Sequence, residues 1–256
     1  MILCFDIGNT HIFGGIFVGK EIAFSFRYPS KNMCTSDQFG LFLKAFLAEH
    51  QLEPKGIRAI SFSSVVPSLE YTIVSACVKY FNITPLQLKP GVKSGLKLCV
   101  KTPTSLGADR IANAVAAVNL FPDQDLIVVD FGTASTICAI SATKEYLGGA
   151  IMPGIKTAME SLSLATAKLA AVEILAPEQA LGKTTEHNIQ SGLYYMQVGA
   201  CRELIGRIKQ EVGFGTGLKI IATGGYAHLF EHEDIFQVNI PNLSLLGLRI
   251  IYEKNC

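Results

Sequence analysis

One pattern that occurs twice, an apolar run ending in Asp-x-Gly, constrains the fold of this chain more than any other feature. The first copy covers residues 2–10 and the second covers residues 126–134, and a second β-rich run follows each. Glycine permits a tight turn, and small residues leave backbone N–H groups free to face an anion. Each aspartate, Asp6 and Asp130, supplies a charge for a cation or for bound water. The pair predicts two similar hairpins that together hold the phosphates of a nucleotide.

The same order of elements is predicted in both halves of the chain. Alternating apolar residues predict a three-stranded meander at each copy, and apolar residues at helical spacing, such as Phe39, Leu43 and Phe46, predict the helices. In the first half, the predicted strands are 2–7, 11–18, 21–27 and 57–63, with a β segment at 96–100 and helices around 39–47, at 68–81 and from Gly107 onward. In the second half, the predicted strands are 126–131, 135–140, 146–151 and 218–222, with helices at 154–170, at 185–212 and after Asn242.

In each half, a three-stranded meander precedes a segment of mixed helices and strands, and no long linker separates the halves. This repeat predicts an α/β fold of two similar domains hinged on a cleft. The boundary is placed at residues 121–125, where the sequence is Phe-Pro-Asp-Gln-Asp. The domains are therefore predicted at residues 1–121 and 122–256. The repeat is one of fold more than of sequence.

Composition argues against several classes of protein. The formal net charge is +1 and no long run of like charge occurs, so neither nucleic acid nor a membrane is an expected partner. No apolar run approaches the roughly 18 residues that span a bilayer, and Asp6 interrupts the apolar N-terminus, which does not resemble a signal peptide. The seven cysteines are odd in number and scattered. They favour reduced, mostly buried thiols and a cytoplasmic location over a disulfide framework or a zinc site.

Residues 107–110, Gly-Ala-Asp-Arg, open an alanine-rich helix and have two interpretations. An acid in the first turn, Asp109, stabilises the helix dipole and needs no catalytic role. Alternatively, the small residues let a ligand approach, Arg110 binds an oxyanion bidentately and Asp109 accepts a hydroxyl proton. The pattern alone does not decide between them.

Other glycine-rich segments carry weaker signals. Residues 148–154 and 223–225 each precede a predicted helix, and bare backbone suits a loop close to a ligand, for the second segment an adenine ring. A plain strand-to-helix turn explains both nearly as well. The Gly-x-x-x-x-Gly-Lys-Ser/Thr signature is absent, and residues 213–217 lack dinucleotide spacing and predict a helix-to-strand loop. One Asp-x-Gly turn would also suit an ordinary hairpin, and only the matched pair favours a nucleotide site.

Two patterns predict structure more than chemistry. Gly192, Gly199 and Gly206 recur every seven residues, which would let another helix approach closely, within the fold or in a dimer. Residues 228–232 match the His-x-x-Glu-His pattern of zinc proteases. No convincing third ligand follows, so two histidines on a solvated helix face are the favoured interpretation.

Taken together, several segments resemble those of type III pantothenate kinases and occur in the same order. The resemblance covers nearly the whole chain. It implies the fold of the acetate and sugar kinase/Hsp70/actin superfamily, with two duplicated ribonuclease-H-like domains (the actin-like ATPase fold) and a nucleotide cleft between them. It also implies transfer of the γ-phosphoryl of ATP to the primary hydroxyl of pantothenate, the first step of coenzyme A synthesis. The segments are 6–11, 107–110, 130–134, 148–154, 182–185 with 189–192, and 223–225.

The resemblance further implies a role for individual residues. Asp109 is the catalytic base, Asp6 lies near the Mg²⁺ that accompanies ATP, and Asp130 holds a monovalent cation, K⁺ or NH₄⁺. The residues implied to contact pantothenate are Gly107, Ala108, Asp109, Arg110 and, at a dimer interface, Thr185. The residues implied to contact ATP are Asp6, Ile7, Gly8, Asn9, Thr10, His11, Ile12, Phe13, Thr133, Gly224 and Gly225.

One departure and two alternatives accompany this hypothesis. Many members place tyrosine, often with asparagine, just before the proline that precedes Gly-Ala-Asp-Arg, whereas this chain has Val100, Lys101 and Thr102 before Pro103. An aromatic contact to substrate from that position is therefore not supported. A kinase of the same superfamily with another substrate would share both phosphate loops but not Gly-Ala-Asp-Arg. A non-catalytic transcriptional accessory protein would be expected to lose Asp6 or Asp109.

Overall fold

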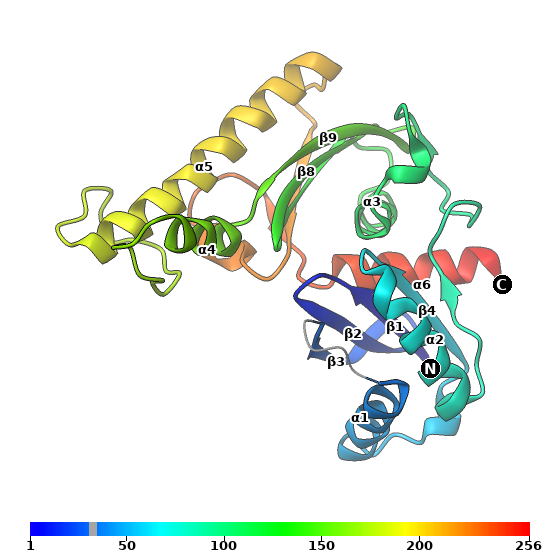
Figure 1. The fold of residues 1–256 in the computed structure, drawn as a ribbon. Helices are drawn as coiled ribbons and strands as arrows, with labels where there is room; N and C mark the ends of the chain where they lie inside the picture. Colours follow the sequence, from blue (N-terminus) through cyan, green and yellow to red (C-terminus); the bar gives the residue numbers. More distant parts are fainter. Residues whose placement is uncertain (31–34) are drawn as a thin grey trace. The chain divides into compact units, whose positions relative to one another are not determined.

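The computed structural model describes residues 1–30 and 35–256, which form two compact units. The first unit comprises Met1–Gly95, Lys101–Ala116 and Leu243–Cys256, and the second comprises Leu96–Val100 and Ala117–Asn242. Figure 1 shows their helices and strands.

A five-stranded mixed sheet forms the centre of the first unit, in the order β3-β2-β1-β4-β5. Strands β1 (Ile2–Ile7), β2 (His11–Val18) and β3 (Glu21–Pro29) make an antiparallel meander, and β4 (Ala59–Ser64) pairs with β1 in parallel. A short strand, β5 (Leu86–Gln87), completes the sheet. The predicted meander is confirmed.

Two helices cover one face of this sheet. α1 (Ser36–Glu49) begins at a capping box, in which Thr35 and Gln38 each hydrogen-bond the backbone N–H of the other. α2 (Pro67–Phe81) starts with proline at its first position. Leu3, Phe5 and Ile7 of β1 are buried in the core beneath them, and Phe5 meets Phe39 edge to face at 5.5 Å between ring centroids.

The last helix, α6 (Leu243–Asn255), packs on the opposite face of the same sheet. A methyl group of Leu245 occupies the space that a side chain at Gly15 would need. The guanidinium of Arg249 lies 5.7 Å from the ring centroid of Phe17. The C-terminal residues therefore belong to the unit that carries the N-terminus.

The second unit repeats the strand order of the first. Its six-stranded sheet runs β11-β10-β7-β8-β9-β6. Strands β7 (Leu126–Phe131), β8 (Ala134–Ile140) and β9 (Glu145–Pro153) form the second meander, and β10 (Lys219–Thr223) joins β7 in parallel, as β4 joins β1. β11 (Val238–Asn239) corresponds to β5 in this order. The duplication predicted from the two Asp-x-Gly segments is confirmed.

Two helices pack on the second sheet, α4 (Ile155–Ala165) and α5 (Thr185–Val212). α5 begins where the Thr184 side chain accepts a hydrogen bond from the N–H of His187 and ends at Gly213 in the left-handed conformation. Its predicted bounds are confirmed. Residues 213–217 form the expected loop between α5 and β10.

α4 ends earlier than the helix predicted for residues 154–170. The backbone becomes extended at Thr166, whose hydroxyl donates to the carbonyl of Leu162 at 2.9 Å. That bond satisfies a carbonyl at the end of the helix without a further turn.

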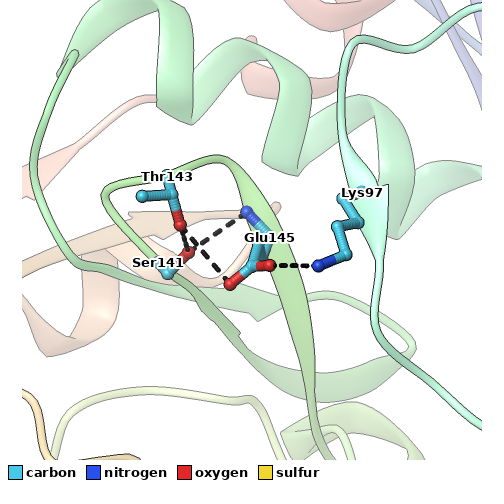
Figure 2. A network of polar contacts seen from close by, with 4 residues as sticks. All are labelled: Lys97, Ser141, Thr143 and Glu145. Carbon is cyan, nitrogen blue, oxygen red and sulfur yellow. Dashed lines mark hydrogen bonds and ion pairs between the residues drawn. The ribbon is translucent and has the colours of Figure 1, made fainter.

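A polar network holds a short strand, β6 (Lys97–Leu98), against β9. The Lys97 ammonium lies 2.6 Å from Glu145 Oε1, while the Ser141 hydroxyl accepts from the Glu145 N–H and contacts Thr143 (Figure 2). Backbone bonds from Lys97 and Cys99 to the second meander add to it. The network fixes the segment that leads to residues 101–107.

The observed division of the chain differs from the predicted one at 121/122. Residues 96–100 join the second sheet through β6, α6 joins the first sheet, and the division near the middle falls within α3 (Ala108–Leu120), after Ala116. The cause is long-range packing, because the sequence of α6 alone does not specify which sheet the helix covers.

The structure also tests the interpretation of residues 228–232. Residues 228–232 start in a short 3₁₀ helix, η3 (Ala227–Phe230), and both of their histidines are exposed. Across residues 1–30 and 35–256, no group of three or more metal-ligating side chains gathers. None of the helices described there is both long and apolar enough to cross a membrane.

Candidate active site

The first Asp-x-Gly segment forms the turn between β1 and β2. Asp6 is the penultimate residue of β1 and is half-buried, and the N–H of Gly8 donates to the carbonyl of His11 at 3.1 Å. A side chain at Gly8 would lie 3.2 Å from that carbonyl oxygen, so glycine suits the turn. Ile7 and Ile12 are fully buried, which leaves only their backbone for any contact with a ligand.

A row of side chains crosses four strands at this turn. The residue opposite Asp6 on β2 is Phe13, the residue opposite Phe13 on β3 is Arg27, and the residue beside Asp6 on β4 is Ser63. Residues paired in this way point to the same face of a sheet. The Ser63 hydroxyl donates to Asp6 Oδ1 at 2.8 Å.

The Asp6 carboxyl has a strongly perturbed pKa. Burial raises this pKa from 3.8 to about 6, and the negative charge of Asp109 raises it as well. Hydrogen bonds from Ser63 and Ser244 and the positive charge of Arg27 act in the opposite direction. Asp6 and Asp109, which lie far apart in the sequence, are thus close enough to repel each other.

Asp109 sits in the first turn of α3. Its Oδ1 atom accepts a hydrogen bond from the N–H of Arg110 at 2.8 Å, and the Gly107 carbonyl accepts the N–H of Ile111. A side chain at Gly107 would come within 2.5 Å of Asp109 Oδ1 and 3.4 Å of Arg110 Nε. Glycine at position 107 therefore makes room for the two charged side chains that follow it.

The second Asp-x-Gly segment forms the turn between β7 and β8. The N–H of Gly132 donates to the carbonyl of Ala134, as Gly8 does to His11 in the first unit. The Thr133 carbonyl accepts from the N–H of Gly154 at 3.1 Å and from the hydroxyl of Thr157 at 2.6 Å. Gly154 packs directly on the Gly132 and Thr133 carbonyls, with no space for a side chain. Residues 148–154 thus pack against the turn at Gly154. The Thr133 side chain is exposed.

Asp130 repeats the position of Asp6, since it pairs with Thr223 on β10 as Asp6 pairs with Ser63 on β4. Its carboxylate lies directly beside the backbone of Gly224, which has a φ of +93°. Any side chain at that position would collide with Asp130 Oδ1 and would also be strained. Gly225 is exposed, with open space around it.

Thr185 is the first residue of α5 and is exposed. It lines an open pocket of about 390 Å³ within the second unit, together with Lys168, Glu173, Glu186 and Ile189.

The structure brings together part of the predicted site. In the first unit, the charge of Asp109 acts on the Asp6 carboxyl, and in the second, Asp130, Thr133 and Gly224 lie at the meander turn. The sequence analysis missed Ser63, Ser244, Arg27 and Thr157. Ser63 ends a predicted strand beside β1, which is the one signal that would have indicated it.

Solved structures identify the class of fold. The chain is similar to a Campylobacter jejuni protein assigned to the Baf family of transcriptional activators, with a TM-score of 0.62 and 20% identity over 99% of this chain and 98% of that one. It is also similar to a Sinorhizobium meliloti protein assigned as a 2-dehydro-3-deoxygalactonokinase, with a TM-score of 0.59 and 10% identity over 99% and 96%. The duplicated sheets with an aspartate at each first turn are those of the actin-like ATPase fold.

Sequence comparison narrows the class to a family. The family model described as type III pantothenate kinase matches residues 2–207. A type III pantothenate kinase of Francisella tularensis is 59% identical over 100% of both chains, and one of Legionella pneumophila is 51% identical over 100% of this chain and 99% of the other. The chain belongs to the type III pantothenate kinase family.

Proposed function

We propose that this protein transfers the γ-phosphoryl of ATP to the primary hydroxyl of pantothenate, giving 4′-phosphopantothenate for coenzyme A synthesis. Family membership supports the reaction, and the observation that carries the site is that Asp109 lies in the same unit as Asp6 and that its charge acts on the Asp6 carboxyl. Asp109 would then act beside Asp6 of the phosphate loop, where the hydroxyl of pantothenate must meet the γ-phosphate. The alternative of a non-catalytic accessory protein has no comparable support.

Asp109 is the proposed general base. Its second oxygen, Oδ2, is not the atom that accepts the Arg110 N–H, so it is available to take the hydroxyl proton as the oxygen attacks phosphorus. Arg110 and the backbone of residues 107 and 108 would bind pantothenate. Thr185 is a further proposed substrate contact.

Asp6 is the proposed partner of Mg²⁺. A half-buried carboxyl that a second carboxyl repels is poorly stabilised as an anion, and a divalent cation beside it would relieve both effects. Bound Mg²⁺ neutralises phosphate charge during phosphoryl transfer. The Gly8, Asn9 and Thr10 turn would lie along the phosphates, with Thr133, Gly224 and Gly225 as the ATP contacts of the second unit.

Asp130 is the proposed ligand of a monovalent cation, K⁺ or NH₄⁺. Its carboxylate lies beside the bare backbone of Gly224, so an oxygen-rich site can form without a side chain in the way. A cation there would assist phosphate binding by the second turn.

A coupled assay of ADP release tests the proposed reaction. With pantothenate, Mg-ATP and K⁺ or NH₄⁺, we expect turnover well above the ATPase background, and with Na⁺ alone a large decrease. The product is checked by mass spectrometry. Turnover no higher than the ATPase background in both K⁺ and NH₄⁺ would refute the proposal.

We also infer a homodimer that forms through α5. Gly192, Gly199 and Gly206 are exposed with open space around each, and Tyr195 and Met196 are 39% and 46% exposed on the same helix. A glycine face flanked by exposed apolar side chains suits close helix packing.

The dimer predicts an effect of one substitution at this face. Gly199→Arg has space in the monomer, so we expect it to keep its fold and to halve the mass measured by light scattering. Ala45→Arg, at an exposed position on α1, is the control and should remain dimeric. A monomeric wild-type protein at micromolar concentration would exclude the dimer.

A further inference from the structure

Arg27 occupies a distinctive position in the polar row of the first sheet. It pairs with Phe13, which pairs with Asp6, so all three side chains lie on one face at the end of the sheet where the β1–β2 turn begins. Its guanidinium carbon lies 4.5 Å from the Phe13 ring centroid. Stacking on the ring orients the planar guanidinium while its N–H edges remain open.

Within residues 1–30 and 35–256, no acidic side chain uses these donors. Among the described residues, Arg27 makes neither an ion pair nor a side-chain hydrogen bond, and it is exposed. Three other arginines, Arg202, Arg207 and Arg249, are each paired with a glutamate. Arg27 thus presents an oriented cation with free donors.

Arg27 and Asp6 lie on either side of Phe13 on the same face of the sheet. The two side chains are not in ion-pair contact. An oxyanion and its cation would therefore satisfy both, the oxyanion at Arg27 and the cation at Asp6.

We propose that Arg27 binds a phosphate group of the nucleotide and that Phe13 positions its guanidinium through stacking. The proposal rests on the proposed function, which places the nucleotide phosphates at the Asp6 turn. Guanidinium binds phosphate with two parallel N–H donors, a geometry that lysine cannot reproduce. Arg27, on β3, thus adds a side-chain contact to the proposed phosphate site at the β1–β2 turn.

Binding measurements without pantothenate test this inference independently of the kinase reaction. By isothermal titration calorimetry with Mg-ADP, we expect Arg27→Gln to weaken binding about tenfold to a hundredfold, the range for a hydrogen bond to a charged group. Arg27→Lys should bind with intermediate affinity, and Phe13→Leu should weaken binding less than Arg27→Gln. Adenosine, which lacks phosphate, should bind all four proteins equally.

Arg58→Gln is the matched control, because Arg58 is an exposed arginine of the same unit outside the polar row. It should bind Mg-ADP as the wild type does. Unchanged Mg-ADP affinity in folded Arg27→Gln would overturn the proposal, and so would an equal loss of adenosine binding. If Arg27→Gln does not fold, wild-type affinity in Arg27→Lys would overturn it as well.

Kinetics separate the two possible oxyanions. We expect Arg27→Gln to raise the KM for ATP and to leave the KM for pantothenate within about twofold. A rise confined to the KM for pantothenate would assign Arg27 to the substrate carboxylate and contradict the proposal. Wild-type protein that binds Mg-ADP without phosphorylating pantothenate would refute the proposed function and leave the binding test of Arg27 intact.

Discussion

Replacing Asp109 by asparagine is expected to lower kcat by about 10²–10⁴-fold, the usual contribution of a general base. Asparagine keeps an oxygen that can accept the Arg110 N–H, so the first turn of α3 should be preserved. It cannot take a proton. It also removes the charge that raises the pKa of Asp6, so binding of Mg-ATP should be unchanged or tighter.

Glu70→Gln is the matched control for Asp109→Asn. Glu70 also lies in the first turn of a helix, α2, so its loss weakens a helix dipole in the same way. We expect Glu70→Gln to change the thermal midpoint slightly and kcat by less than about twofold. If kcat in Asp109→Asn stays near the wild-type value, Asp109 only stabilises the helix dipole and another group is the base.

Replacing Asp6 by asparagine is expected to stabilise the ligand-free protein while it abolishes most activity. The pKa of Asp6 is raised to about 6 in the folded protein, so the folded state binds this proton more tightly than the unfolded chain does. Stability is therefore highest below the unfolded pKa of 3.8, falls as the pH rises to about 6, and stays reduced above it. At 1.36 kcal/mol per pKa unit, the charged carboxyl costs at most about 3 kcal/mol.

The measurement is the free energy of unfolding in urea at several pH values from 5 to 8, without nucleotide or Mg²⁺. The advantage of Asp6→Asn should grow with pH and level off above about 6. Asp37→Asn should instead be less stable than the wild type by an amount that stays constant from pH 5 to 8, because hydrogen bonds from Lys79 and Tyr80 hold the pKa of Asp37 below its usual range. A variant Asp6→Asn that is less stable than the wild type at pH 8 would contradict the assignment of the raised pKa.

Local sequence patterns predicted much of the fold. Apolar alternation and the turn residues of each Asp-x-Gly segment act over a few residues, so both meanders and the bounds of α5 could be predicted. β5, β11 and the 3₁₀ helices are short and have little pattern of their own. Periodicity did not predict the order of the strands in either sheet.

The surroundings of Asp6 could not be predicted in the same way. Ser63 reaches Asp6 through strand register, Ser244 through the packing of α6, and Arg27 through two successive strand pairings. Each of these depends on contacts between residues far apart in the chain. The sequence singled out Asp109 as a candidate but did not show that its charge acts on Asp6.

The return of α6 to the first sheet has a consequence for synthesis on the ribosome. Domains generally fold as they emerge, N-terminal part first, but the first unit lacks its Ser244 and the helix packed on Gly15 until residues 243–255 have left the exit tunnel. A nascent chain can thus complete the second sheet before the surroundings of Asp6 are complete. A chain that ends before residue 243 would leave Asp6 without Ser244 and Gly15 without the helix that packs on it.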